Sequence, residues 1–297
     1  MTDIQTVLGE YSQWFNRHLD SFFSLPAGQE KRVVEAMRYS VVNGGKRLRP
    51  FLVSETAALF GISREQTLNT AAALEMLHSY SLIHDDLPAM DNDDLRRGLP
   101  TCHKQFDEAT AILAGDGLLT YAFEILSRPQ TADSETRLAL ISLLSRDAGA
   151  FRGMIAGQML DLHAEQSREE NKNRLVTRIE EMKTGCLIRF ACEAGALLGR
   201  ASPEQRQALI NYARAVGQTF QISDDILDLE GSPELMGKTL NKDQTQGKVT
   251  FVSLYGLEPA KKIAADLTEQ AKTALLPFGS AADDLRSLAD FIITRNH

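Results

Sequence analysis

The spacing of apolar residues is the feature that most constrains the fold of this chain. Almost every long segment repeats apolar side chains at intervals of three and four residues, the period of a helix with one buried face. One strand-like window, 249–257, is too short to build a sheet. The pattern predicts an all-α protein with helices over residues 33–42, 63–86, 110–126, 134–148, 180–198 and 202–229.

Two of the predicted helices carry recognisable signals at their ends. Ser63 is followed three residues later by Gln66, which is the capping-box pattern, and Pro88 limits how far that helix continues. Ser202 is a suitable N-cap, and Pro203 suits the first helical position, where its missing N–H is not needed. These signals place the starts of the two helices that matter most for function.

The length of 297 residues allows one or two domains. The sequence contains no internal repeat, no low-complexity tract and no linker rich in proline, glycine and serine. We therefore expect a single helical domain over residues 1–297.

Composition and charge exclude several classes of protein. The chain has 43% hydrophobic residues and a net charge of -8, which is a poor match to the phosphates of a nucleic acid. The chain has no run of about 18 uninterrupted apolar residues, so we do not expect it to insert into a membrane. The first 15 residues lack the pattern of an export signal, and Cys102, Cys186 and Cys192 lack the spacing of disulfides or a zinc site. We expect a cytoplasmic protein whose main partner is not a nucleic acid.

Two groups of acidic residues interrupt the apolar pattern. The first group is Asp85, Asp86 and Asp91, and the second is Asp224, Asp225 and Asp228 within the predicted 202–229 helix. Residues four apart on a helix lie about 40° from each other around the axis, so Asp224 and Asp228 share a face. An isolated pair of aspartates is more often an exposed acidic face. Here apolar residues surround the second group, so its charges need a counter-cation.

Magnesium is the predicted counter-cation. Pro88 frees the residues after the helix to fold back, which brings Asp91 near Asp85. Oxygen ligands that are few in number suit magnesium bound jointly by protein and substrate phosphates. The predicted metal ligands are Asp85, Asp86, Asp91, Asp224 and Asp228.

Basic residues near these groups predict two anion pockets. Each cation alone is as well explained by a solvated surface, but together with two acidic groups they indicate phosphate binding. The basic stretches are Lys46, Arg47 and Arg49 within residues 44–50, then Arg96 and Arg97, then Lys183 with Thr184, and finally Lys238 with Thr239.

The ordered set of motifs resembles the trans-isoprenyl diphosphate synthases, most closely the bacterial farnesyl diphosphate synthases. The matching motifs span roughly residues 40–255, and His78 and Gln221 belong to them together with the acidic and basic residues named above. The resemblance implies the all-helical isoprenoid synthase fold, built around a central cavity, and a homodimer. Two departures are Asn241 to Asp243, in place of the usual Gly-x-Asp, and Val252 in place of a common proline.

The resemblance also implies residue roles. About three magnesium ions, or manganese, would be held by the five aspartates named above on the allylic diphosphate, assisted by Arg96, Lys183 and Lys238. Lys46, Arg49, His78 and Arg97 would hold isopentenyl diphosphate. Thr184 and Gln221 would face the developing allylic cation. Asp85, Asp86, Asp91, Lys183 and Asp224 are the implied catalytic residues. Tyr80, with Ser81 beside it, would form the floor that stops growth at fifteen carbons.

The expected reaction condenses isopentenyl diphosphate with dimethylallyl or geranyl diphosphate to give farnesyl diphosphate. The closer alternatives are geranyl and geranylgeranyl diphosphate synthases of the same family and terpene cyclases, which share similar metal motifs. A more distant alternative is an all-helical metal phosphohydrolase, because His78 and His84 lie near the aspartates. A nucleotide phosphate loop fits poorly, since five residues rather than four separate Gly231 from Gly237. A non-catalytic helical partner protein would show no turnover.

Overall fold

The computed structural model describes residues 3–164, 172–230 and 250–295 of the chain. Its elements are α1 (Ile4–Leu19), η1 (Asp20–Phe22), α2 (Lys31–Val42), α3 (Leu48–Ala58), α4 (Arg64–Asp85), β1 (Leu95–Arg96), β2 (Leu99–Pro100), α5 (Cys102–Gln105), α6 (Glu108–Ser127), α7 (Ser134–Ala148), α8 (Met154–Ala164), α9 (Lys172–Glu180), η2 (Glu181–Gly185), α10 (Cys186–Leu198), α11 (Pro203–Glu230), α14 (Phe251–Tyr255), α15 (Leu257–Ala274), η3 (Leu276–Ala282) and α16 (Asp283–Thr294).

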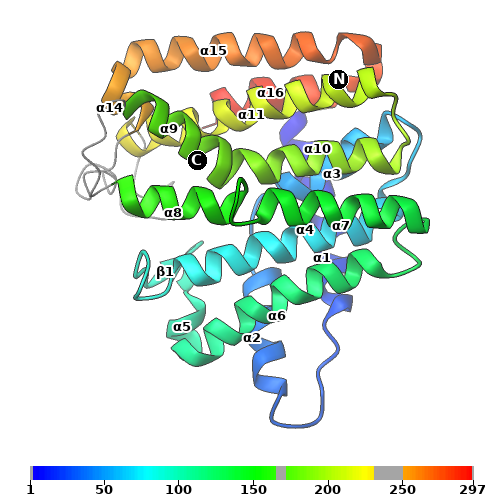
Figure 1. Ribbon diagram of the computed structural model, residues 1–297, viewed down its shortest axis with the longest axis vertical. Helices are drawn as coiled ribbons and strands as arrows, with labels where there is room; N and C mark the ends of the chain where they lie inside the picture. Colours follow the sequence, from blue (N-terminus) through cyan, green and yellow to red (C-terminus); the bar gives the residue numbers. More distant parts are fainter. Residues whose placement is uncertain (1–2, 165–171, 231–249, 296–297) are drawn as a thin grey trace.

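The long helices lie side by side across the molecule, from α15 at the top of Figure 1 to α2 at the bottom. Helix α4 packs against α3 and α6, while α10 packs against α3 and α11, and α11 packs against α15. Residues 70–77 of α4 are all buried, because this helix has neighbours on every side. The two helices that hold the acidic groups, α4 and α11, therefore belong to the core of the bundle.

The predicted helix starts are confirmed. The Ser63 N–H donates to Gln66 Oε1 at 2.9 Å, completing the capping box of α4. At α11, the Gln205 N–H donates to Ser202 Oγ at 3.2 Å, and Pro203 is the first helical residue. The bounds predicted for the helices over 33–42, 110–126 and 134–148 agree with the structure to within two residues.

Two local predictions differ from the structure. The window 249–257 was expected to be strand-like, but residues 251–255 form α14 and Leu257 begins α15. Thr250 caps α14 by accepting the Ser253 N–H at 3.2 Å, and this local bond favours a helix over an extended chain. The predicted 180–198 helix is interrupted by η2, a π-helical turn over Glu181–Gly185. A short antiparallel hairpin, β1–β2, was not predicted.

Helix α6 is long and apolar enough to cross a membrane by length and composition alone. Its buried residues, which include Ala111, Leu118 and Ile125, pack into the core, and α4 is its main neighbour. This packing explains its apolar composition as that of a core helix.

Candidate active site

The first acidic group lies where α4 ends. The chain folds back as predicted, because the Asp91 N–H donates to the Asp85 carbonyl at 2.9 Å. A second bond joins the Asp93 N–H to the Asp86 carbonyl at 3.2 Å. Burial raises the pKa of Asp85, and the charge of Asp91 raises it further while Lys183 opposes the shift. The turn therefore gathers carboxylates that repel each other in a half-buried position.

Asp86 is paired with Arg96. The Arg96 Nε donates to Asp86 Oδ2 at 2.8 Å, and Nη2 donates to Oδ1 of the same carboxylate. The side chain of Asp86 is 3% exposed, whereas that of Arg96 is 33% exposed. The structure thus joins a predicted metal ligand to a predicted phosphate-binding residue, and β1 supplies the arginine.

Helix α8 adds two polar residues that sequence analysis missed. The side chain of Gln158 donates to Asp85 Oδ1, and Asp161 Oδ2 accepts from Lys183 Nζ at 2.6 Å. Lys183 Nζ also lies 3.9 Å from Asp85 Oδ2. Although burial lowers the pKa of Lys183, Asp85 and Asp161 raise it more, so the ammonium stays charged. The sequence did hold a signal for these two residues, because Gln158 and Asp161 are the polar residues of an otherwise apolar stretch, 154–162.

The π-helical turn η2 positions Lys183 and Thr184. Such turns change the direction of successive side chains and are frequent at functional sites. The backbone of α8 touches this turn, since a Cβ at Gly157 would lie 2.2 Å from the Lys183 nitrogen. A Cβ at Gly217 would lie 3.3 Å from Gly185 Cα, so α11 is also close. Glycines on both sides therefore let two helices approach the backbone that holds Lys183.

A chain of hydrogen bonds leads from η2 to the second acidic group. Thr184 Oγ1 donates to Gln221 Oε1 at 3.1 Å, and Gln221 Nε2 donates to Asp225 Oδ1 at 3.3 Å. The other oxygen of Asp225 accepts the Phe251 N–H at 3.0 Å, so this carboxylate also anchors α14. Because Lys183 lies beside Asp85 and Thr184 beside Gln221, adjacent residues connect the two acidic groups.

Glu180 is a buried carboxyl group that sequence analysis did not single out. Burial, and then the nearby charge of Asp225, raise the pKa of Glu180 to about 10. One of its oxygens has no hydrogen-bond partner among the described residues. Glu180 is therefore protonated at neutral pH and adds no charge beside the second group.

Asp224 contacts the carboxyl-terminal end of the described chain. Arg295 Nη2 donates to Asp224 Oδ1, and the Arg295 guanidinium lies 4.0 Å from the centroid of the Phe220 ring. Burial and Arg295 lower the pKa of Lys46, while Asp224 raises it. The predicted phosphate-binding residue Lys46 is therefore near the second acidic group. Sequence analysis did not identify Arg295.

Arg49 and His78, which were both predicted to bind isopentenyl diphosphate, face each other. Arg49 Nη1 lies 3.4 Å from His78 Nε2. Burial, and then the charge of Arg49, hold the pKa of His78 well below its ordinary value, so the imidazole is neutral. The buried Arg49 Nε has no partner among the residues described, which leaves a donor that an anion can satisfy.

The glycines of the turn between α2 and α3 make room for Arg97. Its Nη1 donates to the Gly44 carbonyl at 2.6 Å, and a Cβ at Gly45 would lie 2.7 Å from its guanidinium carbon. Gly44 and Gly45 have φ angles of 82° and 109°, which favour glycine. The turn thus brings Arg97 to the same loop as Lys46.

Arg47, the middle cation of that turn, points into the core. Its backbone is left-handed with φ of 52°, and its Nη1 pairs with Glu75 Oε1 at 2.5 Å. Both side chains are at most 3% exposed, and Asn16 Oδ1 accepts from the arginine Nε at 2.8 Å. Arg47 therefore holds the turn in place and is not available to a substrate.

The predicted chain-length residues lie one turn before Asp85. Tyr80 is 6% exposed and packs edge-on against His84, with ring centroids 5.7 Å apart. The Ser81 hydroxyl donates to the His78 carbonyl at 2.7 Å. His84 Nε2 lies 3.0 Å from the Ile112 carbonyl, so this histidine contacts α6 and not a carboxylate.

The donor atoms of the two acidic groups suit magnesium. The two acidic groups offer carboxylate oxygens, the ligands that magnesium prefers. Within residues 3–164, 172–230 and 250–295, no three acidic, histidine or cysteine side chains form a ready metal-binding cluster. Magnesium commonly uses one or two carboxylates together with substrate phosphates, so the residues fit an ion that arrives with its substrate. Lys238, another predicted ligand of the diphosphate, lies outside the described residues.

Comparisons with known proteins show the family of this chain. The polyprenyl synthetase family model matches residues 30–277. The farnesyl diphosphate synthase of Escherichia coli strain K12 is 47% identical over 290 residues, covering 95% of each chain. That of Haemophilus influenzae is 45% identical over 94% of each chain. The structure of an FPP/GFPP synthase from Zymomonas mobilis superposes with a TM-score of 0.89 at 45% identity, covering 98% of each chain.

The fold is the isoprenoid synthase fold, and the chain is an all-helical prenyltransferase. The chain belongs to the polyprenyl synthetase family.

Proposed function

We propose that this prenyltransferase condenses isopentenyl diphosphate with dimethylallyl or geranyl diphosphate and is a farnesyl diphosphate synthase. One observation carries the proposal. The carboxylates of α4 and α11 are connected through Lys183, which lies by Asp85, and Thr184, which bonds Gln221. The relatives that are named farnesyl diphosphate synthases span nearly the whole chain.

The residues divide into two pockets. Asp85, Asp86, Asp91, Asp224 and Asp228 would hold magnesium, which stabilises the negative charge that grows on the departing diphosphate. Lys183 would bind the same diphosphate. Arg49 and Lys46 would bind isopentenyl diphosphate, and neutral His78 would orient it. Fixed charges of this kind replace water, which would quench an allylic cation.

The bond-forming step depends on positioning. The Thr184 hydroxyl and the Gln221 carbonyl bring oxygens near the acidic groups, where they would face the allylic cation. The isopentenyl double bond has to lie within about 3.5 Å of that cation to attack it. No described side chain in these pockets is a clear base, so the departing diphosphate would accept the final proton. The proposed product has fifteen carbons because the side chain of Tyr80 would block further growth of the hydrocarbon.

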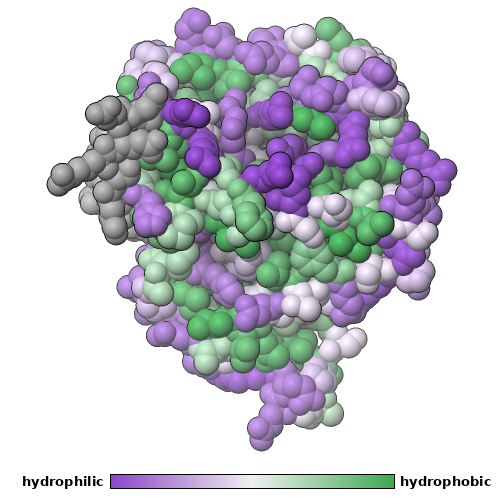
Figure 2. Space-filling model, viewed as in Figure 1, coloured by the Kyte–Doolittle hydropathy of each residue, from purple (hydrophilic) through white to green (hydrophobic). Residues whose placement is uncertain are grey.

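A homodimer in the cytoplasm is part of the proposal. Exposed apolar side chains lie on α6 and α7, where Leu113 is 58% and Leu138 68% exposed. Figure 2 shows apolar surface over these helices in the same view as Figure 1. A second copy of the chain would cover it. Sedimentation velocity should give a dimer for the wild type and a monomer for Leu113→Lys, and a monomeric wild type would contradict this part.

The enzyme assay tests the proposal directly. The purified chain is incubated with isopentenyl diphosphate, geranyl diphosphate and magnesium, and the products are separated by chain length. We expect farnesyl diphosphate as the main product. Asp224→Asn should lower kcat by about 100-fold or more, because removing one charge-stabilising group commonly costs about 3 kcal/mol of transition-state stabilisation.

The matched control is Asp266→Asn, a surface aspartate of α15 that pairs with Lys262 and is 60% exposed. It should leave kcat unchanged. Absence of any chain elongation, or release of phosphate without elongation, would overturn the proposal in favour of a phosphohydrolase. The structure argues against that alternative, because His78 faces Arg49 and His84 contacts the Ile112 carbonyl.

A further inference from the structure

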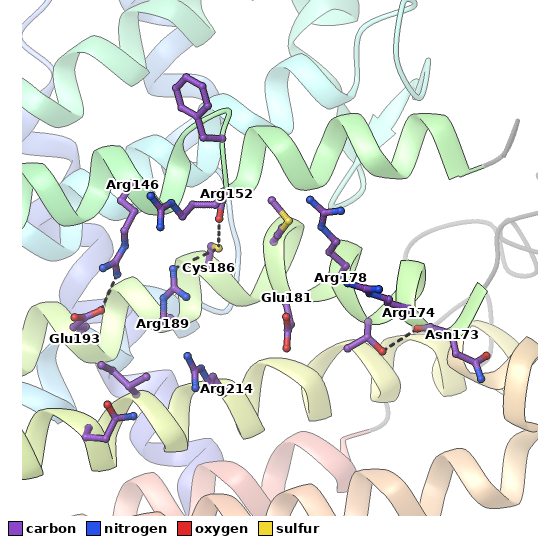
Figure 3. Close-up of a pocket in the computed structure, with 15 residues that line it drawn as sticks. Arg146, Arg152, Asn173, Arg174, Arg178, Glu181, Cys186, Arg189, Glu193 and Arg214 are labelled. Carbon is purple, nitrogen blue, oxygen red and sulfur yellow. Dashed lines mark hydrogen bonds and ion pairs between the residues drawn. The ribbon is translucent and has the colours of Figure 1, made fainter. Parts of the chain in front are cut away.

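A second concave region lies on the other side of the helix that holds Lys183. It is a groove of about 940 Å³, bounded by α7 and the turn that follows it on one side and by α9, η2, α10 and α11 on the others (Figure 3). We call it the arginine groove, because six arginines line it: Arg146, Arg152, Arg174, Arg178, Arg189 and Arg214. We propose that the arginine groove binds an organic diphosphate or triphosphate.

The arginine groove is separate from the candidate active site. Met182 and Cys186 line the groove, whereas Lys183 and Thr184, which lie between them in sequence, contact Asp161 and Gln221. The η2 turn and the start of α10 therefore form a wall with the acidic groups on one side and the arginines on the other. A ligand in the groove does not occupy either of the two diphosphate pockets.

Two of the arginines are fixed in place by buried carboxylates. Arg189 Nη2 pairs with Asp147 Oδ1 at 2.6 Å, and Arg146 Nε pairs with the same oxygen at 2.8 Å. Arg146 also reaches Glu193, which Arg206 contacts from its other side. Asp147 and Glu193 are thus already paired with arginines. Glu181 also lines the groove, so its carboxylate offsets one of the remaining positive charges.

Three other arginines enter the groove without a carboxylate partner. Within the described residues, no acidic side chain lies within ion-pair distance of Arg152, Arg178 or Arg214. They come from the turn after α7, from α9 and from α11, so three separate elements converge on one cavity (Figure 3). The chain as a whole has a net charge of -8, so this local excess of positive charge is not a property of its composition.

The position of Arg152 is supported from the wall itself. The Cys186 thiol lies 3.6 Å from the Arg152 carbonyl, and Arg189 Nη2 lies 3.8 Å from the same sulfur. Figure 3 marks these contacts across the groove. The loop that carries Arg152 is therefore tied to α10, which reduces the ordering that a ligand would have to impose.

The guanidinium groups define the chemistry of the ligand. Arginine binds phosphate oxygens in pairs. The three guanidiniums that have no carboxylate partner among the described residues outnumber the carboxylate of Glu181, so the groove suits the negative charge of a diphosphate or triphosphate. The volume is much larger than the phosphates need, and Met182 and Ile210 add apolar surface to the lining. These features fit a polyphosphate that carries an organic group, such as a nucleotide or an isoprenoid diphosphate.

Titration calorimetry on the full chain tests this inference. ATP, farnesyl diphosphate and inorganic pyrophosphate are titrated separately into the wild type and into the Arg178→Ala/Arg214→Ala variant, with EDTA present to remove magnesium. Each lost charge-assisted hydrogen bond weakens binding by about 10-fold or more, so the double variant should lose about 100-fold in affinity at the groove. If ATP or farnesyl diphosphate binds more tightly than pyrophosphate, that result identifies whether the groove takes a nucleotide or an isoprenoid diphosphate.

The matched control is Arg200→Ala/Lys262→Ala, which removes two surface cations whose side chains are 81% and 78% exposed. It should keep wild-type affinity for all three probes. The kinetic constants for prenyl transfer in the groove variant should also stay unchanged, which separates this test from the proposed function. The inference is overturned if the groove variant binds every probe as the wild type does, or if the wild type binds none of them outside the active site.

Discussion

Replacement of Gly157 by alanine should impair catalysis through the backbone of the π-helical turn. Gly157 belongs to α8, and its Cα faces the segment that holds Lys183. An alanine Cβ at this position would lie 2.2 Å from the Lys183 nitrogen and 2.7 Å from its Cα. Both neighbours are backbone atoms, so no rotation of a side chain can relieve the contact.

The size of the displacement follows from these distances. Ordinary contact begins at 3.4 Å, so η2 and α8 must separate by about 1.2 Å, the difference between 3.4 and 2.2 Å. A shift of about 1 Å in a catalytic group commonly lowers the rate by about 100-fold. We therefore expect kcat to fall by about 100-fold, while the KM for isopentenyl diphosphate changes little, because Arg49 and His78 lie on other helices.

Steady-state kinetics with geranyl and isopentenyl diphosphates measures this effect, and circular dichroism confirms that the variant is folded. The control is Gly9→Ala in α1, where a Cβ would have no neighbour within 4 Å. That variant should keep wild-type kcat. A folded Gly157→Ala enzyme with kcat within about threefold of the wild type would refute the argument, since the predicted shift requires a much larger loss.

Three further predictions concern product length, pH and metal. Tyr80→Ala should lengthen the product, measured by chromatography, because the side chain that stops the hydrocarbon is gone. Glu55→Gln should stabilise the protein by about 3 kcal/mol at pH 8 but by less than about 1 kcal/mol at pH 5 in urea denaturation, since burial and Asp284 raise the pKa of Glu55 to about 7. Arg295→Met should lower the magnesium concentration for half-maximal activity by about threefold, because Arg295 occupies a carboxylate of Asp224.

The sign of the pH effect follows from the direction of the shift. The folded-state pKa of Glu55 lies above its unfolded value of 4.5, so its contribution favours folding at low pH and is lost as the pH rises through 7. The exposed control Glu258→Gln, whose side chain is 84% exposed, should change stability little at either pH. Equal effects of Glu55→Gln at both pH values would contradict the burial argument.

The other two predictions have equally direct contradictions. An unchanged fifteen-carbon product from Tyr80→Ala would show that the floor lies elsewhere. For Arg295→Met, an unchanged or higher magnesium requirement would show that the arginine does not compete with the metal at Asp224.

Helix positions were predictable because they depend on local periodicity and caps. Ser63 with Gln66 and Ser202 with Pro203 mark helix starts that the structure confirms. The π-helical turn was not predictable, because it depends on α8 and α11 approaching the chain at glycines. The window 249–257 is strand-like in sequence, yet its residues 251–255 form a helix. Phe251 packs in a small separate cluster, and periodicity over so few residues does not distinguish a buried helix from a strand.

The candidate site was predictable where function requires a run of like charges. Asp85 and Asp91 approach each other as Pro88 suggested. Side chains that act through a distant partner gave no such signal. Asp161 and Arg295 are single charges in otherwise ordinary helical sequence, and only the tertiary fold shows that they contact Lys183 and Asp224.

The basic residues of the stretch 46–49 have two different roles, and the left-handed backbone at Arg47 separates them. Lys46 lies near Asp224 and Arg49 faces His78, while Arg47 is sealed beside Glu75. Breaking a buried ion pair leaves an uncompensated charge and costs about 3 to 5 kcal/mol. A mutational survey of this loop would therefore record defects at Lys46 and Arg49 as altered kinetics, but defects at Arg47 as a lower yield of folded protein.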